Sequence, residues 1–228
     1  MKAPLAEFLG TFTLVFIGAG AGALLEANSA GLVGVAFAHG LALMVIVYTW
    51  GSISGAHVNP AVTLGAAVTG RINAVTAIAY WVAQFAGGVA AAYLLSYLIG
   101  PNGGNLGQTI GSLTPGIEGV SRELASPART IIVEGILTFF LMTSVFASGI
   151  LNKNGNLAGV AIGLVLTMDI IMGGSLTGAS MNPARTFGPA LVLRDVQSMS
   201  YVWMYLVGPF AGAAVGALLY NQMASKQD

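Results

Sequence analysis

The chain has 228 residues with a formal net charge of zero, and 56% of them are hydrophobic while only 7% are charged. Soluble domains carry roughly 25% charged residues, so this shortage indicates that most of the chain lies in a membrane. Zero net charge gives no sign of a nucleic-acid-binding surface, and the absence of cysteine excludes disulfides, thiolate metal sites and cysteine nucleophiles.

Apolar segments long enough to cross a membrane recur along the chain, since a span needs roughly 20 apolar residues. Six qualify, at about 4–25, 31–50, 75–99, 128–150, 157–174 and 200–221. Two shorter apolar stretches, 60–69 and 183–193, have lengths typical of core helices or re-entrant segments. The first run also resembles a signal peptide, but Glu7 at its start and a matching run later in the chain favour a span.

The two halves of the chain repeat. LAEFLGTF (5–12) matches IVEGILTF (132–139), ISGAHVNPAVTLG (53–65) matches LTGASMNPARTFG (176–188), and VAQFAGG (82–88) matches VGPFAGA (207–213). Each half, about 1–99 and 128–221 with the polar connection 100–127 between them, contains three spans, so the second half enters the membrane inverted. The sequence predicts one all-α membrane domain over 1–228, in which two re-entrant half-helices meet near the membrane centre.

Both short segments begin with the same triplet, Asn59-Pro60-Ala61 and Asn182-Pro183-Ala184. Asn is a favoured N-cap and Pro suits the first helical position, so each triplet predicts a helix start. The Asn oxygen accepts a backbone N–H, which leaves the amide NH₂ to donate to a passing water. Two helix starts that meet head to head also place two positive dipole ends together, which opposes proton passage.

The segments SGAHVNPAVT and SGASMNPARTFGP resemble the twin signature loops of aquaporins and aquaglyceroporins, and the resemblance covers all six spans. It implies the hourglass fold, in which six tilted helices surround two half-helices, with one pore per subunit in a homotetramer. It also implies a passive channel for water, with no cofactor or metal. An enzyme is not expected, because two histidines offer no Ser-His-acid set.

The resemblance assigns roles to the unwound stretches that precede each triplet. Their carbonyls are expected to form an acceptor ladder along the pore, since irregular backbone at membrane depth is buried in protein or lines a water-filled cavity. The stretches contain Gly55, Ala56 and His57, and Gly178, Ala179 and Ser180. Glu7 and Glu134 hold equivalent places in the two halves. We expect them to brace these loops by accepting N–H groups; a proton relay is the alternative.

The resemblance also implies a selectivity filter of four residues, located by their spacing from the two Asn residues: His39, Ile170, Ala179 and Arg185. This set is similar to that of plant tonoplast intrinsic proteins and archaeal aquaporins. Ile170 removes a polar donor and Ala179 leaves space, so ammonia, urea and glycerol are expected to pass besides water. Arg185 is expected to be hydrated, fixed by carbonyls and repulsive to cations. The alternatives are that Arg185 is an interfacial anchor and that His39 packs away from the pore.

Two other transport functions remain as alternatives. Thr186 after Arg185 favours a water channel over a glycerol facilitator, whereas Leu206 stands where water-selective members commonly have an aromatic residue. Inverted repeats also occur in secondary transporters, but no paired acids near the midplane would carry a coupling ion. Three environments remain as alternatives for Asp169: contact with solvent near the outer mouth, pairing with a neighbouring group, and a contact between subunits.

Orientation and assembly follow from charge and from small residues. Lys2, Arg71, Lys153 and Lys226 fall on one side, against Arg122, Arg129 and Arg194 on the other. The positive-inside rule then places both termini in the cytoplasm, with the plasma or inner membrane as the expected location. Rows of small residues predict close helix packing within or between subunits. These rows are Gly208, Gly212 and Gly216, and Ala83, Gly87 and Ala91.

Overall fold

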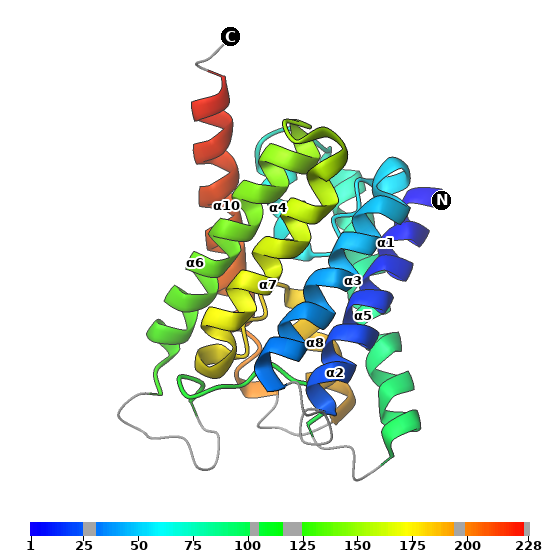
Figure 1. Cartoon of the computed structure of the whole chain (residues 1–228), viewed down its shortest axis with the longest axis vertical. Helices are drawn as coiled ribbons and strands as arrows, with labels where there is room; N and C mark the ends of the chain where they lie inside the picture. The colour runs from blue at the N-terminus through cyan, green and yellow to red at the C-terminus, as the bar shows by residue number, and fades with distance from the viewer. Residues whose placement is uncertain (25–30, 101–104, 116–124, 194–198, 226–228) are drawn as a thin grey trace.

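The computed structural model describes residues 1–24, 31–100, 105–115, 125–193 and 199–225, so Arg122, Arg194 and Lys226 lie outside the described residues. Within this part the chain is helical without strands, and six helices are long and apolar enough to cross a membrane (Figure 1). They run over Lys2–Ala23, Gly31–Ser54, Ala74–Ile99, Pro127–Ile150, Gly155–Thr177 and Met204–Ala224. The expected all-α membrane fold is confirmed.

The spans are built from the following elements. In the first half they are α1 (Lys2–Leu14), the π-helical turn η1 (Val15–Ala19), α2 (Gly20–Ala23), α3 (Gly31–Ser54) and α5 (Ala74–Ile99). In the second half they are α6 (Pro127–Val145), the π-helical turn η2 (Phe146–Ile150), η3 (Gly155–Leu157), α7 (Ala158–Thr177) and α10 (Met204–Ala224). The boundaries differ from expectation by a few residues, because α3 continues past 50 and α10 begins after 200.

Two short helices, α4 (Pro60–Val68) and α8 (Pro183–Leu193), do not cross the membrane. They have 9 and 11 residues, which at about 1.5 Å per residue is roughly half of a membrane core about 30 Å thick. Figure 1 shows α4 in the half of the molecule that carries the start of α1 and the end of α10, and α8 in the opposite half. These are the two expected half-helices.

The inverted repeat is visible in how equivalent helices pack. In the first half α5 lies against α1, and a Cβ added to Gly87 would be 3.1 Å from the Phe12 nitrogen. In the second half α10 lies against α6, and a Cβ added to Gly212 would be 3.0 Å from the Gly135 Cα. Both glycines belong to the small-residue rows, so these rows bring helices together inside one subunit.

The two halves join where α3 crosses α7. A Cβ added to Gly40 would lie 2.5 Å from the Gly163 carbonyl oxygen, and a Cβ added to Gly163 would lie 2.5 Å from the Gly40 oxygen. Only glycine permits this approach, because any side chain would push the two backbones apart. The crossing places the middle of α3 beside the middle of α7, where two of the expected filter residues are located.

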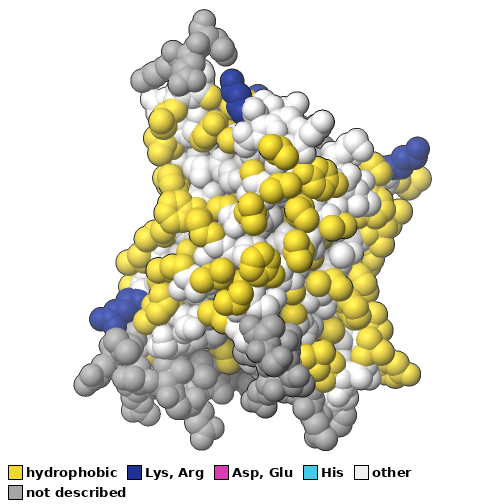
Figure 2. Space-filling model, viewed as in Figure 1, with side chains coloured by type: hydrophobic (Ala, Val, Ile, Leu, Met, Phe, Trp, Pro, Cys, Tyr) yellow, Lys and Arg dark blue, Asp and Glu magenta, His cyan; other side chains and the backbone are white. Residues whose placement is uncertain are grey.

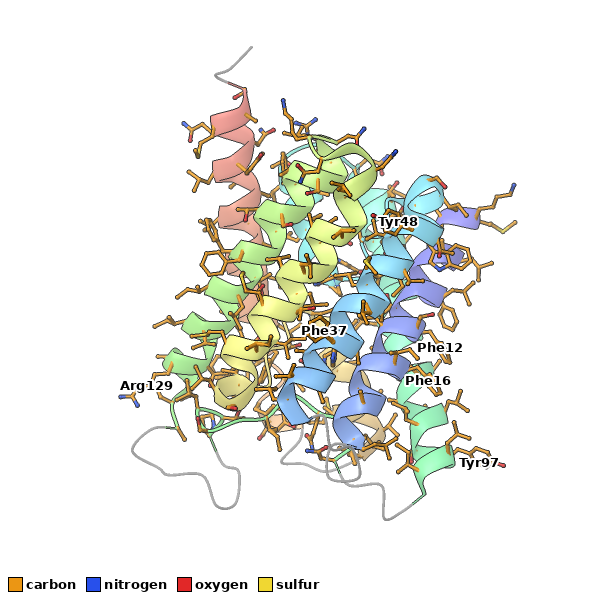
Figure 3. All side chains as sticks on the ribbon, viewed as in Figure 1. Phe12, Phe16, Phe37, Tyr48, Tyr97 and Arg129 are labelled. Atoms are coloured by element: carbon orange, nitrogen blue, oxygen red, sulfur yellow. The ribbon has the colours of Figure 1, made fainter. Side chains whose placement is uncertain are left out.

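The surface fits a membrane-spanning protein. Figure 2 shows hydrophobic side chains over the middle of the viewed face and Lys and Arg side chains only towards its ends. Tyr48 and Tyr97, which are 52% and 83% exposed, lie near opposite ends (Figure 3), where aromatic residues meet the two membrane interfaces. The start of α1 and the last turn of α10 lie at one end (Figure 1), and Arg129 points outward at the other (Figure 3).

Candidate functional site

The two signature asparagines cap the half-helices. Asn59 Oδ1 accepts the Ala61 N–H at 2.8 Å, with Pro60 at the first helical position. Asn182 Oδ1 accepts the N–H groups of Ala184 at 3.1 Å and Arg185 at 3.3 Å. Each helix start is therefore formed by its own Asn, as the side-chain chemistry of an N-cap requires.

The same asparagines tie the two loops to each other. Asn59 Nδ2 donates to the Met181 carbonyl at 2.8 Å, and Asn182 Nδ2 donates to the Val58 carbonyl at 2.9 Å. An amide nitrogen has two N–H bonds, so one of each pair is committed across the interface and one remains. Both asparagines line the same cavity. The sequence could not indicate this exchange, because it joins residues more than a hundred positions apart.

Both loops have a backbone conformation that most residues avoid. In the first loop φ is +88° at Gly55, +48° at Ala56 and +42° at Val58. The equivalent positions of the second loop are also left-handed, with φ of +83° at Gly178, +43° at Ala179 and +53° at Met181. Such a conformation costs of order 1–3 kcal/mol at a non-glycine residue, so strong contacts must hold each loop in place.

Two buried acids supply these contacts. Glu7 accepts the backbone N–H groups of His57 at 2.9 Å and Val58 at 2.6 Å. Glu134 accepts those of Ser180 at 3.0 Å and Met181 at 2.8 Å. Each carboxylate thus receives the N–H groups directly before a signature Asn, and charge-assisted bonds of this kind are among the stronger ones.

Hydroxyl groups complete both braces, and sequence reasoning missed them. Ser54 donates to Glu7 at 2.6 Å, and the repeat-equivalent Thr177 donates to Glu134 at 2.7 Å. Gln84 Nε2 also donates to Glu7, at 2.7 Å. The sequence contained a signal for these hydroxyl groups, since aligning the two halves places a hydroxyl-bearing residue at both 54 and 177.

His57 donates its backbone N–H to Glu7, and its side chain also packs beside the first loop. Its Nδ1 lies 3.1 Å from Thr63 Oγ1, and its ring meets the Tyr80 ring edge to face at 5.3 Å between centroids. In the second half the equivalent of His57 is Ser180, which contacts Thr186 at 2.5 Å. The two loops therefore share backbone geometry but differ in the side chains behind it.

Two cavities run along the loops. The larger, about 330 Å³, extends from Arg71 and Ile150 past both asparagines, and the smaller, about 140 Å³, lies beside Asn105 and Gln108. Gly55, Ala56, His57 and Ser180 line the larger cavity and Gly178 lines the smaller, whereas Ala179 is buried without lining either.

His39 and Arg185 line both cavities, so they form the border between them. Ile170 lines the smaller cavity only. Two of the four expected filter residues therefore lie at this border, and a third lines the smaller cavity next to it. The Ala179 side chain instead faces α7, where a Cβ added to Gly173 would be 3.3 Å from it.

The polar groups at the border have few protein partners. His39 Nδ1 donates to the Val35 carbonyl at 2.9 Å, while its Nε2 is buried without a partner among the described residues. Arg185 Nε and Nη1 are also buried with no partner among these residues, so the expected carbonyl clamp on Arg185 is not seen there. Buried polar groups normally find a partner, and water in the adjoining cavities is the obvious one.

The described part of the polar connection, residues 105–115, reaches the site. Thr109 Oγ1 lies 2.8 Å from Thr186 Oγ1, one position after Arg185, and Gln108 Oε1 accepts the Tyr201 hydroxyl hydrogen. The Leu113 N–H donates to the Leu176 carbonyl at 2.8 Å. Sequence reasoning treated 100–127 only as a connection, because its composition carries no periodic signal.

Asp169 stands apart from the pore. It is 1% exposed, its Oδ2 has no partner among the described residues, and it lines neither cavity. Solvent contact is therefore wrong for this residue. Among the described residues, no group of three His, Asp or Glu side chains is arranged to hold a metal ion.

Comparison with known proteins gives consistent matches. The family model described as major intrinsic protein matches residues 1–220. The chain is 41% identical to "Aquaporin TIP1-2" of Zea mays, covering 96% of this chain and 85% of that one, and 42% identical to "Aquaporin NIP1-4" of Oryza sativa subsp. japonica, covering 95% and 75%. Its fold is similar to the X-ray structure of the aquaglyceroporin from Plasmodium falciparum, with a TM-score of 0.85 at 24% identity over 99% of this chain and 97% of that one.

Proposed function

The chain belongs to the major intrinsic protein family of membrane channels, and on that premise we propose that its pore conducts water together with small neutral solutes. Members of the family are passive channels and not enzymes. Ammonia is the solute expected to pass most readily, followed by urea and then glycerol, while protons and ions are excluded.

The observation that carries this proposal is the border between the two cavities. His39 and Arg185 line both cavities, and Ile170, Gly174 and Gly178 are among the residues that line the smaller one. An isoleucine and two glycines offer an apolar wall without bulk, so a solute larger than water meets little obstruction on that side. The nitrogen atoms of His39 and Arg185 that lack a partner among the described residues can replace part of the hydration of such a solute.

Ion exclusion is assigned to two features. The Arg185 guanidinium lies at the border, where its charge repels cations. Deeper in the larger cavity, the starts of α4 and α8 meet with their positive dipole ends and one uncommitted N–H of each signature Asn. A water at that point accepts from both amides, which turns its hydrogens away and interrupts proton transfer along the file.

The proposal includes orientation and assembly. One end of the molecule carries the start of α1, with Lys2, and the last turn of α10, and we assign it to the cytoplasm, with Arg129 on the far side (Figures 1 and 3). The subunit is proposed to form a homotetramer in the membrane. The similar aquaporins carry TIP and NIP names, so they lend no support to a plasma or inner membrane, and only the orientation is kept.

The test is stopped-flow permeability of reconstituted vesicles to water, ammonia, urea and glycerol. The parent protein is compared with the double variant His39→Phe, Ile170→His, which places an aromatic ring and a polar donor at the border. We expect the parent to pass ammonia and urea and the variant to keep water flow while passing less of both. A parent that excludes both solutes, or a variant that passes them equally well, would overturn the proposal.

A further inference from the structure

We propose that Gly18 is a positioning residue for the border: its missing side chain determines where the His39 ring rests, and hence which solutes pass beside Arg185. The inference rests on the proposed function for its effect on solutes, but the contact between Gly18 and His39 is independent of it. Gly18 lies in the first span, far from both signature loops in sequence.

The contact is close and involves one neighbour. A Cβ added to Gly18 would be 2.5 Å from His39 Nε2 and 2.7 Å from His39 Cγ, and it would also meet Cδ2. Real Cβ atoms essentially never come within 3.0 Å of such atoms, so the ring or the helix would have to move. The ring occupies the space that a side chain at position 18 would need.

This glycine differs from the packing glycines of the fold. At Gly40 and Gly163 the nearest obstacle includes the backbone of the facing helix, so a side chain would force two helices apart. At Gly18 all three nearest atoms belong to the His39 ring. A side chain can rotate at far lower cost than a helix can shift, so substitution of Gly18 displaces the ring first.

A π-helical turn presents Gly18 to the ring. Gly18 is the fourth residue of η1 (Val15–Ala19), and such turns hold one extra residue, which changes the register of the face that follows them. The second half has a similar turn, η2 (Phe146–Ile150), with Gly149 as its fourth residue. A Cβ added to Gly149 would be 3.6 Å from its nearest neighbour, which is ordinary contact. Of these two π-helical turns, the first therefore has an aromatic ring packed against its glycine, and the second does not.

The direction in which the ring would move follows from its other contacts. His39 Nδ1 donates to the Val35 carbonyl at 2.9 Å, within the same helix, and this bond tethers the ring near α3. The ring has its Cδ2 side, with Nε2 and Cγ next to it, against Gly18, and both His39 and Arg185 line the two cavities beside it. A methyl group at position 18 would clash with the His39 ring and displace the ring towards the border, where the displaced ring would narrow the passage.

The experiment joins a flux measurement to a spectroscopic one, using Gly18→Ala in the full chain. The chain has two histidines, so magic-angle-spinning NMR of protein labelled with ¹⁵N in histidine reports on His39 and His57 alone. The Gly18→Ala variant should shift the His39 ring signals and leave those of His57 in place. Urea permeability of reconstituted vesicles should fall about tenfold or more, the factor that about 1.4 kcal/mol of added barrier produces, with a smaller loss for water.

Two further variants keep the result decisive. Gly51→Ala makes the same change on α3, where a Cβ would meet nothing within 4 Å, and should alter neither signals nor flux. In a His39→Ala background, Gly18→Ala should change the ratio of urea to water permeability no further, and should fold even if the single variant does not. Unchanged His39 signals in Gly18→Ala, or an equal effect of Gly18→Ala with and without the ring, would refute the inference. A parent that excludes both ammonia and urea would instead refute the proposed function, while the NMR comparison still decides on Gly18.

Discussion

At the scale of single residues, the border between the cavities combines one fixed charge with nitrogen atoms that have no protein partner among the described residues. Arg185 Nε and Nη1 and His39 Nε2 are buried without a partner among the described residues. Leaving a buried polar group unsatisfied costs about 1–3 kcal/mol, and more for a charged one. The chain keeps these groups at the border although three of their nitrogen atoms have no protein partner in the described part of the chain, which is typical of a functional site.

Replacing Arg185 with Val should raise the leak of protons or small cations through reconstituted vesicles while water permeability is largely kept. A cation about 4 Å from the guanidinium is repelled by about 1 kcal/mol in water and about 4 kcal/mol at an effective dielectric constant of 20. The leak should therefore increase about tenfold or more. Fluorescence of a trapped pH indicator measures it.

The control for this change is Arg129→Val, which removes an exposed arginine that points outward at the end of the molecule (Figure 3). Its proton leak should match that of the parent. If Arg185→Val shows no more leak than the control, Arg185 is not a main part of the barrier, and the helix dipoles with the two asparagines carry the exclusion alone.

At the scale of elements, the two re-entrant loops depend on their braces. Each loop holds three residues in the left-handed region, including the β-branched Val58, for which a positive φ is an outlier. The carboxylates of Glu7 and Glu134 compensate by accepting the N–H groups of consecutive residues. These bonds occupy the carboxylates, which fits the brace interpretation and leaves a proton relay without support.

Replacing Glu134 with Gln should destabilise the protein, because an amide offers one acceptor oxygen where the carboxylate offers two. Glu134 Oε1 accepts from Thr177 and Ser180, and Oε2 accepts from Met181. Losing a hydrogen bond to a charged group costs about 1.5–3 kcal/mol. Thermal unfolding in detergent should show this loss, together with reduced water permeability.

Asp169→Asn is the matched control, since it makes the same chemical change to a buried acid of the same half. Asp169 Oδ2 accepts no hydrogen bond from the described residues, so its replacement should leave stability unchanged or raise it. Equal destabilisation by the two variants would show that loss of a buried charge, and not loss of the brace, explains the effect.

At the scale of the whole molecule, the inverted repeat explains why one chain can build a pore lined from both ends. Equivalent small residues pack α5 on α1 and α10 on α6, and the loops exchange hydrogen bonds at the centre. The small-residue rows are thereby used inside the subunit. In the proposed homotetramer, contacts between subunits would come from the outward faces, where large apolar side chains are abundant.

Native mass spectrometry in mild detergent should detect four chains of 23.1 kDa in one particle. The physical reason is that each subunit presents apolar side chains around its middle, and the family resemblance gives the number four. A sample in denaturing detergent provides the single-chain mass. Detection of monomers alone under mild conditions, together with no cross-linked species in vesicles, would contradict the proposed assembly.

The sequence alone determined the features that depend on local pattern. Hydropathy located six spans within a few residues, because a membrane imposes length and apolarity on each helix separately. The repeated triplets predicted two capped half-helices, and the paired positions of Glu7 and Glu134 predicted a brace, since a buried acid needs donors. These inferences use spacing and side-chain chemistry, which the chain carries without folding.

The tertiary structure decided the contacts between distant residues. It committed one N–H of Asn59 and one of Asn182 to the opposite loops, brought Thr109 to Thr186, and turned Ala179 away from both cavities. It also set the His39 ring against Gly18. None of these follows from local pattern, because the position of a side chain within a passage depends on helix crossings and on which neighbours lack a Cβ. Such contacts exist only once the helices have packed.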